Sequence, residues 1–240
     1  MKVLKNWNEI GNAVNSLVKA GLPLHSTPAK CWDFNNIREV FSQSPFNESS
    51  HIVDLGCGPS LNGCMTLELL YSMGYRNLTG VDIHIPGYTR LAAAIRGFKK
   101  ARNMKQYKMV TSDITATKFP DNSVDGAVLL SVVEHGVDLE KLFSELKRIM
   151  RQGGKVYLST DYWEKGAGLG KDAMAASGAL DNKALPWTIF DKKAVENLIM
   201  IAEANGFNAQ GGGSIPPCED RPVYWQDIDY TFIALVFEKK

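Results

Sequence analysis

The fold of this chain is decided by the stretch Val53-Asp54-Leu55-Gly56-Cys57-Gly58-Pro59-Ser60. Its apolar start is typical of a buried strand, and the glycines after it predict a tight turn into a helix. Gly56 and Gly58 carry no Cβ, so the turn can bring bare backbone against a ligand. Asp54 stands just before the turn. Its carboxylate would repel a phosphate but would favour a cationic ligand that bears an amino acid.

Composition restricts the class of protein. The chain has 240 residues, of which 45% are hydrophobic and 22% are charged, as in a globular protein with one domain or one domain and a small cap. The formal net charge of +1 gives no reason to expect a nucleic acid as partner. No stretch approaches the roughly 18 apolar residues of a membrane span, and the first residues lack the apolar core of a signal peptide. We therefore expect a cytoplasmic protein that does not insert into membranes.

Four cysteines are present, and their spacing contains no Cys-x-x-Cys pair. No histidine lies at the distance that a zinc finger requires, so we expect no structural metal. The four are Cys31, Cys57, Cys64 and Cys218. The simplest interpretation of Cys57, in the glycine turn, and Cys64, on the following helix, is that both are reduced and half-buried in a cytoplasmic protein.

Hydrophobic periodicity predicts an α/β fold. Residues 1–50 hold two apolar stripes at helical spacing, 7–18 and 34–41, and we expect them to form a helical cap. Strands and helices then alternate, which implies a mostly parallel sheet with helices on both faces. The expected strands are 52–55, 78–83, 106–111, 124–133, 156–160 and 231–237, and the main helices 61–73, one marked by apolar positions 91, 95 and 98, 139–150, and one that Asp191 caps and Gly206 ends.

The segment 162–189 interrupts this alternation. It carries four glycines and two tryptophans and only a weak helical pattern. Irregular segments of this length in a compact domain are usually lids or binding loops. It follows the fifth expected strand, on the side where open α/β sheets bind ligands.

The glycine turn excludes two common nucleotide motifs. A dinucleotide fingerprint needs a third glycine where Leu61 stands, and a phosphate loop needs a Gly-Lys-Ser/Thr run that is absent. The turn is instead similar to the first motif of class I S-adenosylmethionine-dependent methyltransferases, although Ser60 stands where that family often has a further glycine. The resemblance implies that Gly56 and Gly58 contact S-adenosylmethionine and that Asp54 assists its amino group.

Two further acidic residues follow in the order that this family has. Asp82 lies 24 residues after Gly58 at the tip of the second strand, where a carboxylate can accept both hydroxyls of a ribose. The resemblance implies that Asp113, which closes the third strand, binds the adenine amino group. It also implies that the neighbours Ile83 and Ile114 belong to the cofactor site. Taken alone, Asp82 and Asp113 could equally be turn or capping residues.

A fourth block resembles the small-molecule branch of the family (methyltransferase type 11-like). It runs from Phe119-Pro120-Asp121-Asn122-Ser123-Val124-Asp125 to Ser131-Val132-Val133-Glu134-His135, and residues 146–156 resemble the next block. The motifs together span residues 52–161. The resemblance implies a doubly wound, seven-stranded, Rossmann-like sheet whose last strand is antiparallel. It also implies a S-adenosylmethionine-binding domain over residues 51–240, with the cap of residues 1–50 over the cofactor and Ser131 in the cofactor site.

His135 and Asp161 are the candidate catalytic residues. A neutral imidazole at the end of the fourth strand could take a proton from the acceptor, although a lone histidine is often structural. Asp161, at the end of the fifth strand, is the alternative base. Glu134, His135 and Asp161 could hold a divalent metal, as in some sugar and catechol O-methyltransferases, but we expect none because methyl transfer itself requires no metal.

The resemblance therefore implies methyl transfer to a small molecule. Ser131-Val132-Val133-Glu134 is unlike the Asn/Asp-Pro-Pro-Tyr run of nucleic-acid amino-methyltransferases, and Pro217-Cys218 comes too late for a cytosine enzyme. The runs 159–163 and 186–190 resemble methyltransferases of glycan and lipid-carrier biosynthesis. We expect a hydroxyl of a sugar or similar polar metabolite as acceptor. A nicotinamide-dependent oxidoreductase, an aminopropyltransferase and a non-catalytic S-adenosylmethionine-binding partner subunit remain alternatives, and the oligomeric state stays open.

Overall fold

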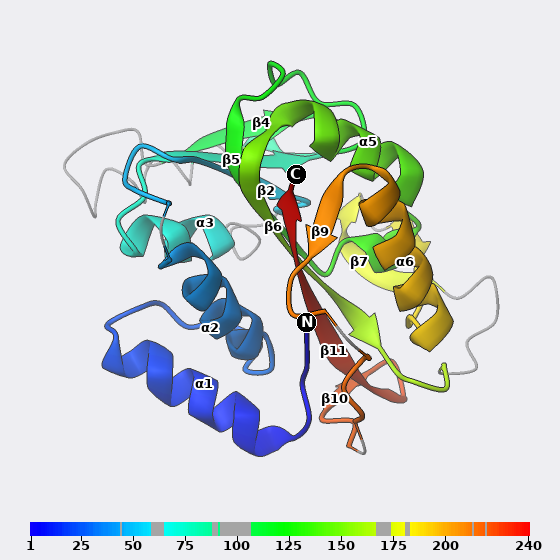
Figure 1. Cartoon of the computed structure of the whole chain (residues 1–240). Coiled ribbons are helices and arrows are strands. Elements are labelled where there is room, and N and C mark those ends of the chain that lie inside the picture. Colours follow the sequence, from blue (N-terminus) through cyan, green and yellow to red (C-terminus); the bar gives the residue numbers. More distant parts are fainter. Residues whose placement is uncertain are drawn as a thin grey trace.

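The computed structural model describes residues 1–43, 45–58, 65–87, 91, 107–166, 174–180, 183–212, 214–218 and 220–240. Within this part, the chain folds into one large twisted sheet that helices cover on both faces (Figure 1). Two further strands form a separate hairpin. Part of the motif quoted above, Pro59 and Ser60, lies outside the described residues, as does Cys64.

The sheet confirms the predicted fold class. Along its main path the described residues give seven strands, and the last one of the chain runs antiparallel to its neighbour. All pairs between β6 and β4 along this path are parallel. The order is β1 (Lys2–Val3), β11 (Ile228–Lys239), β6 (Met150–Tyr162), β5 (Val124–Leu130), β2 (His51–Leu55), β3 (Asn77–Asp82) and β4 (Lys108–Thr111), and the short strands β9 (Phe207–Ala209) and β10 (Val223–Trp225) also pair with β11.

The strand order reverses between β2 and β5. From β2 the chain proceeds outward to β3 and β4, and it then returns to place β5 on the other side of β2. Asp54 pairs in register with Val128, so the carboxyl ends of the two strands lie side by side. Open α/β sheets bind ligands in the crevice at such a reversal. The fold therefore predicts a site between Gly56 and Ser131.

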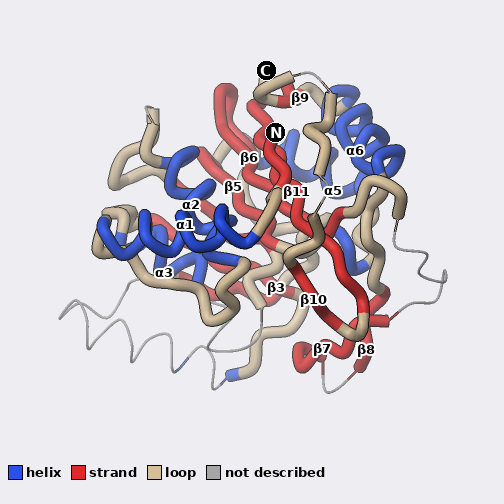
Figure 2. Tube along the Cα trace, turned by 90° about the horizontal axis from the view of Figure 1, so that it is seen from below, coloured by secondary structure: helices blue, strands red, loops and turns tan. Residues whose placement is uncertain are grey.

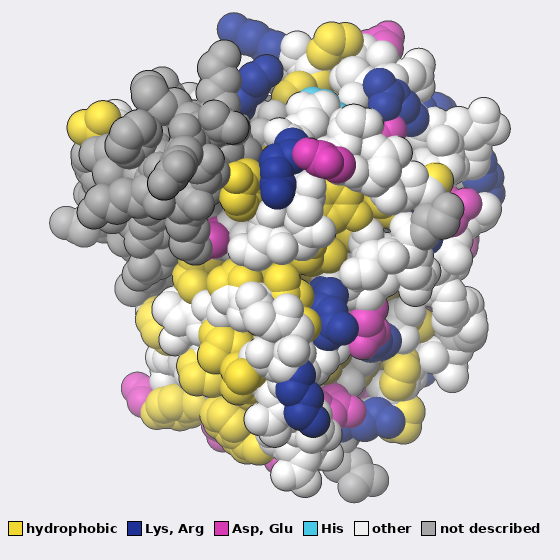
Figure 3. Space-filling model, turned by 90° about the vertical axis from the view of Figure 1, so that its left-hand side faces the viewer, with side chains coloured by type: hydrophobic (Ala, Val, Ile, Leu, Met, Phe, Trp, Pro, Cys, Tyr) yellow, Lys and Arg dark blue, Asp and Glu magenta, His cyan; other side chains and the backbone are white. Residues whose placement is uncertain are grey.

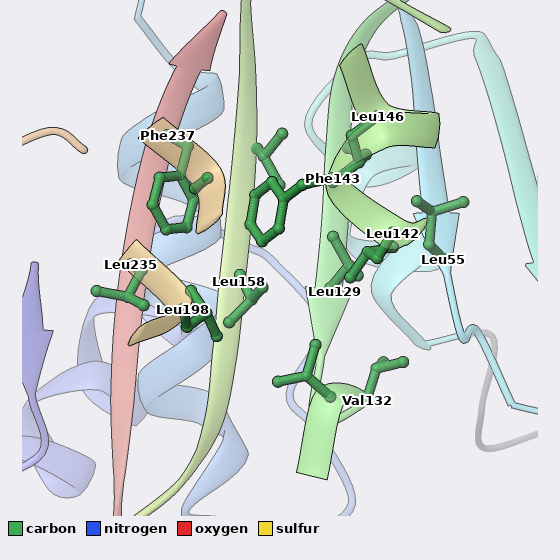
Figure 4. Close-up of a cluster of buried hydrophobic side chains, with 14 of the residues drawn as sticks. Leu55, Leu129, Val132, Leu142, Phe143, Leu146, Leu158, Leu198, Leu235 and Phe237 are labelled. Carbon is green, nitrogen blue, oxygen red and sulfur yellow. The ribbon is translucent and has the colours of Figure 1, made fainter. Parts of the chain in front are cut away.

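The helices form two layers, which Figures 1 and 2 show on opposite sides of the sheet. One layer contains α1 (Trp7–Lys19), α2 (Lys30–Phe41) and α3 (Met65–Ser72), and the other contains α5 (Leu139–Ile149) and α6 (Lys192–Ala204). Each layer covers its own hydrophobic core. Figure 4 shows the core under α5 and α6. In this core the rings of Phe143 of α5 and Phe237 of β11 pack edge to face, with their centroids 5.4 Å apart.

The predicted helix caps are present. Asp138 accepts a hydrogen bond from the backbone N–H of Lys141 at 3.1 Å at the start of α5, and Asp191 accepts one from Ala194 at 2.7 Å at the start of α6. These bonds satisfy donors that a helix cannot pair internally.

The first residues of the chain pack into the sheet. β1 pairs with β11, and Phe34, Ile37 and Phe41 of α2 are buried in the core that β5 and β6 share. On α1, Ile10 and Leu17 are buried, but Trp7 and Val18 of the same predicted stripe are 61% and 59% exposed. Figure 3 views the side that α1, α2 and α3 cover and shows hydrophobic side chains at its surface. The division at residue 50 stays a prediction.

Three differences from the predicted elements bear on the site. The fifth expected strand, β6, already begins at Met150, which pairs with Val124 of β5. The register then shifts, because Gly126 pairs with Lys155, so the extra residues of this irregularity, which include two glycines, lie in β6. β5 ends at Leu130, and the residues predicted as its end form a 3-10 turn, η1 (Val133–His135). The segment predicted as an irregular lid contains an antiparallel hairpin of β7 (Met174–Leu180) and β8 (Lys183–Pro186).

Two glycine substitutions test how tightly α2 packs on the sheet. A Cβ on Gly126 of β5 would lie 2.5 Å from Phe41 Cε1, and the Phe41 ring is fully buried. We expect Gly126→Ala to lower the free energy of unfolding by about 1–3 kcal/mol in urea denaturation. Gly11→Ala is the control, since a Cβ on this α1 residue meets nothing within 4 Å. It should raise stability by about 0.5–1 kcal/mol, and equal effects of the two changes would contradict the packing.

Candidate functional site

A cavity of about 510 Å³ lies where the fold predicts it, at the carboxyl ends of the strands. The residues that line it come from the glycine turn, from the ends of β3, β4 and β5, from the start of α5 and from the β7–β8 hairpin. Eight of the ten predicted site residues are among them, so the structure brings these together, while their individual roles stay predictions. They are Gly56, Gly58, Asp82, Ile83, Asp113, Ile114, Ser131 and His135.

The glycine turn forms one wall of this cavity. Gly56 and Gly58 have φ angles of +80° and +77°, in the left-handed region that favours glycine. A Cβ on Gly56 would also lie 2.6 Å from Cγ2 of Val132, so only glycine lets the turn approach the end of β5. The backbone N–H groups of Gly56 and Cys57 donate to Val81 O at 2.8 and 3.1 Å. The turn is therefore held rigidly beside the end of β3.

Asp54 lies behind the glycine turn, in a second hollow of about 130 Å³ that Gly56 and Gly58 also line. The Asp54 side chain is 2% exposed, and its Oδ2 has no hydrogen-bond partner among the described residues. Burial, and then the charge of Asp82, raise its pKa well above the usual value. A buried carboxyl group with an unpaired oxygen fits a ligand that supplies an ammonium group at this point.

Asp82 links the turn to the cavity. Its Oδ2 accepts a hydrogen bond from the backbone N–H of Gly58 at 2.9 Å, and its Oδ1 accepts one from the N–H of His84 at 3.1 Å. These bonds fix the plane of the carboxylate. Each oxygen has a second lone pair, so the group can still accept two hydroxyls of a ribose.

The far end of the cavity is flanked by two isoleucines. Ile83 is 63% exposed, and Ile114 is nearly buried. An exposed isoleucine on a cavity wall suits an apolar ring that would cover it. Asp113 accepts two hydrogen bonds from Thr115 on Oδ1, both of 2.8 Å, so the turn interpretation of this residue also holds. Its other oxygen can accept an exocyclic amine.

His135 lies at the opposite end of the cavity, on η1. Its Nδ1 is 3.0 Å from Pro186 O, and because a carbonyl oxygen only accepts, Nδ1 carries the hydrogen in the neutral ring. Nε2 then holds the lone pair that a general base needs. The backbone of Thr188 donates to Glu134 O at 3.0 Å, and Leu185 of β8 lines the same cavity. The predicted lid segment thus borders the site and is attached to η1.

Asp161 lies apart from the other predicted residues. It is 5% exposed and is not among the lining residues of the cavity. Its Oδ2 accepts a hydrogen bond from Trp187 Nε1 at 2.8 Å. Burial, followed by the charge of Glu134, raises the pKa of Asp161 to about 7. Asp161 therefore sits behind the cavity wall and not on it.

Glu134 is buried next to Asp161. Its Oε2 accepts a hydrogen bond from Thr160 Oγ1 at 3.0 Å, while Oε1 has no partner among the described residues. Burial raises its pKa, and the charge of Lys30 opposes this effect. In the described part of the chain, no group of three His, Cys, Asp or Glu side chains could hold a metal ion.

Sequence reasoning missed Lys30 and His25, which both come from the predicted cap. Lys30 Nζ donates a hydrogen bond to Ser131 Oγ. His25 lines the hollow of Asp54, and burial, followed by the charge of Lys30, lowers its pKa to about 4, so its ring is neutral. No motif marks a lysine or histidine that reaches a site from a distant helix or loop, so only the packing of this segment shows them.

Residues 53–158 match a protein-family model described as a methyltransferase domain. This range includes the glycine turn and the strand ends that line the cavity, so the part of the chain that builds the site resembles a methyltransferase domain. A sterol 24-C-methyltransferase from Gibberella zeae is 31% identical over 103 residues, which are 43% of this chain and 25% of that protein. The chain thus matches about a quarter of the length of this curated relative.

Solved structures share the fold of this chain. A S-adenosylmethionine-dependent methyltransferase from Methanosarcina mazei aligns with a TM-score of 0.58 and 19% identity, over 85% of this chain and 96% of that one. A geranyl diphosphate C-methyltransferase from Streptomyces coelicolor, solved with S-adenosylhomocysteine, aligns with a TM-score of 0.60 and 14% identity, over 87% and 78%. At these identities the likeness establishes the fold. No helix in the described ranges has the length and apolar character needed to cross a membrane.

Asp82 provides a direct test of the cofactor site. We expect Asp82→Asn to weaken binding of S-adenosylhomocysteine about tenfold in calorimetry, because an amide keeps one acceptor but replaces the other with a donor. Asp229→Asn, an exposed substitution on β11, should bind like the wild type. Unchanged affinity in the Asp82 variant would place the ribose elsewhere.

Asp161 makes stability depend on pH in a predictable direction. Its folded pKa of about 7 exceeds the unfolded value of about 3.9, so the folded chain keeps a proton that the unfolded chain releases. The free energy of unfolding should therefore fall as pH rises from about 5 to about 7, by at most about 1.4 kcal/mol per pH unit. Asp161→Asn should flatten this slope in urea denaturation. An equally steep slope in the variant would show that another group causes it.

Proposed function

We propose that this chain transfers a methyl group from S-adenosylmethionine to a small-molecule acceptor. The observation that carries this proposal is the buried Oδ2 of Asp54 at the glycine turn, which has no hydrogen-bond partner among the described residues. Beyond the turn, Asp82 and Asp113 are among the carboxylates that line the cavity. The donor has an ammonium, a ribose and an adenine amine in the same order. Asp54 would hold the first, Asp82 the second and Asp113 the third, with the ring between Ile83 and Ile114.

This orientation leaves the sulfonium end of the donor toward Ser131 and His135. When bound, the donor supplies an electrophilic methyl group. The chain aligns the acceptor with it, and the β7–β8 hairpin reduces access of water to this end. His135 Nε2 holds a lone pair because Nδ1 donates to Pro186 O, so His135 would accept the proton that the acceptor loses. Asp161 is the alternative base and acts from behind the wall.

The acceptor that we propose is a hydroxyl group of a sugar or a similar polar metabolite. Three buried polar side chains next to this end of the cavity support it, since an apolar acceptor would need none of them. They are Lys30, Glu134 and Asp161. The relatives named above act on a sterol and on geranyl diphosphate, so both must be included in any panel of candidate acceptors.

We place the protein in the cytoplasm, with a small molecule and no nucleic acid as partner and no membrane insertion. Cys31 and Cys218 are free thiols, which suits a reducing compartment. The three alternative functions predict different ligands. Thermal protection by a nicotinamide nucleotide, transfer from the decarboxylated donor, or donor binding without any turnover would support the oxidoreductase, the aminopropyltransferase or the partner subunit, respectively.

The role of His135 is testable with a radiolabelled donor and a panel of sugars, other polar hydroxyl compounds, prenyl diphosphates and sterols. We expect His135→Ala to lower kcat about 100-fold or more, the range for loss of a general base. Affinity for S-adenosylhomocysteine should change less than about threefold, because binding of the donor depends mainly on the carboxylates. Full turnover in the variant would remove His135 as the base, and absence of transfer to the whole panel would count against the polar-acceptor proposal.

A further inference from the structure

Lys30 places a positive charge inside the protein, between α2 and the ends of β5 and β11. Its side chain is 12% exposed, and its ammonium lies 3.6 Å from Asp33 Oδ2 and 3.5 Å from the centre of the Phe232 ring. The same ammonium donates a hydrogen bond to Ser131 Oγ. A cation this deeply buried needs opposite charge around it.

Three buried carboxyl groups supply that charge. Asp33, Glu134 and Asp161 are 0%, 1% and 5% exposed and come from α2, η1 and β6. Burial raises the pKa of each, and the charge of Lys30 lowers it again. The other titratable groups that face Asp161 are His135 and Tyr230, while Tyr157 donates a hydrogen bond to Asp33 at 2.8 Å. Since one ammonium cannot balance three carboxylates, it sets how many of them are ionised.

Lys30 also stabilises an unusual backbone conformation. Ser131 has a φ of +54°, a left-handed value that is energetically unfavourable for a residue other than glycine. Such a conformation persists where several contacts hold it in place. Here the N–H of Ser131 donates to Ser159 O at 3.0 Å, and its Oγ accepts from Lys30. Ser131 lines the cavity, so Lys30 touches the cavity wall from behind.

We propose that Lys30 is a positioning residue for methyl transfer, which holds Ser131 in place and favours the ionised form of Asp161 near His135. This inference rests on the proposed function. When His135 accepts a proton from the acceptor it becomes an imidazolium, and an ionised Asp161 stabilises that charge. Without the ammonium, a larger fraction of Asp161 would be protonated at neutral pH, and Asp161 would stabilise the imidazolium less. The N-terminal segment would then be part of the reaction site.

Trp187 reports the charge of Asp161 directly, because its indole N–H donates to Asp161 Oδ2 at 2.8 Å. The NMR shift of this indole proton, assigned with Trp187→Phe, should titrate with a midpoint near pH 7 in the wild type. Lys30→Met should raise the midpoint by about one pH unit or more, the effect of losing a nearby opposite charge. Lys30→Arg keeps the charge and should restore it. Lys19→Met, an exposed change at the end of α1, is the control and should match the wild type.

Turnover provides the second measurement. We expect Lys30→Met to lower kcat at neutral pH about tenfold and to move the acid limb of the pH profile upward, while affinity for S-adenosylhomocysteine changes less than about threefold. A purely structural role would lower stability without moving either pH midpoint. An unchanged Trp187 midpoint in Lys30→Met would overturn the proposal.

Two further results complete the test. If Lys30→Met fails to fold, Lys30→Gln and Lys30→Arg replace it in the test. Lys30→Gln must shift the Trp187 midpoint and Lys30→Arg must leave it unchanged. Any other pair of results overturns the proposal. If the midpoint shifts as expected but no acceptor is methylated by the wild type, the proposed function is rejected. The charge relation between Lys30 and Asp161 then stands without it.

Discussion

The parallel pairing of β2 with β5 is the constraint on which the rest of the site depends. It brings Gly56 so close to Val132 that any Cβ at position 56 would lie 2.6 Å from a methyl carbon. The glycine turn and the end of β5 therefore form two walls of one cavity. Asp54 lines the smaller hollow behind the turn, and Ser131 lines the main cavity in front of it. This one contact therefore sets how the groups follow one another, from Asp54 behind the turn to His135 at the end of the cavity.

The buried charges beside the cavity contribute little to net stability. Transfer of Lys30 and three carboxyl groups out of water costs more than their attraction usually returns, and apolar residues of similar size often stabilise a fold better. Removal of one partner is nevertheless harmful, since it leaves the others uncompensated. A cluster of this kind makes physical sense where charge is needed at a fixed place. Its position behind Ser131 and His135 is such a place.

Most residues on the donor side of the site could be predicted from the sequence. Most of the other site residues could not, and the reason is physical. Asp54, Asp82 and Asp113 each lie within two residues of the carboxyl end of a strand, so their order along the chain gives their order along the sheet edge. Lys30 has no such relation to β5, and only the packing of α2 brings it there. The short strands β1, β9 and β10 were missed because two or three residues carry too little periodicity, and their pairing with β11 determines them.

The two sides of the site also differ in what relatives can say about them. The family match covers residues 53–158, and the carboxylates of the donor side all lie inside this range. Most residues that line the cavity near His135 also lie inside this range, and Leu185 is the lining residue outside it. The charged groups behind the wall, Lys30 and Asp161, also lie outside the matched range. A relative can therefore share the matched range and still differ in the groups behind the wall. A sterol or a prenyl diphosphate as the acceptor of a relative thus does not determine the acceptor of this chain.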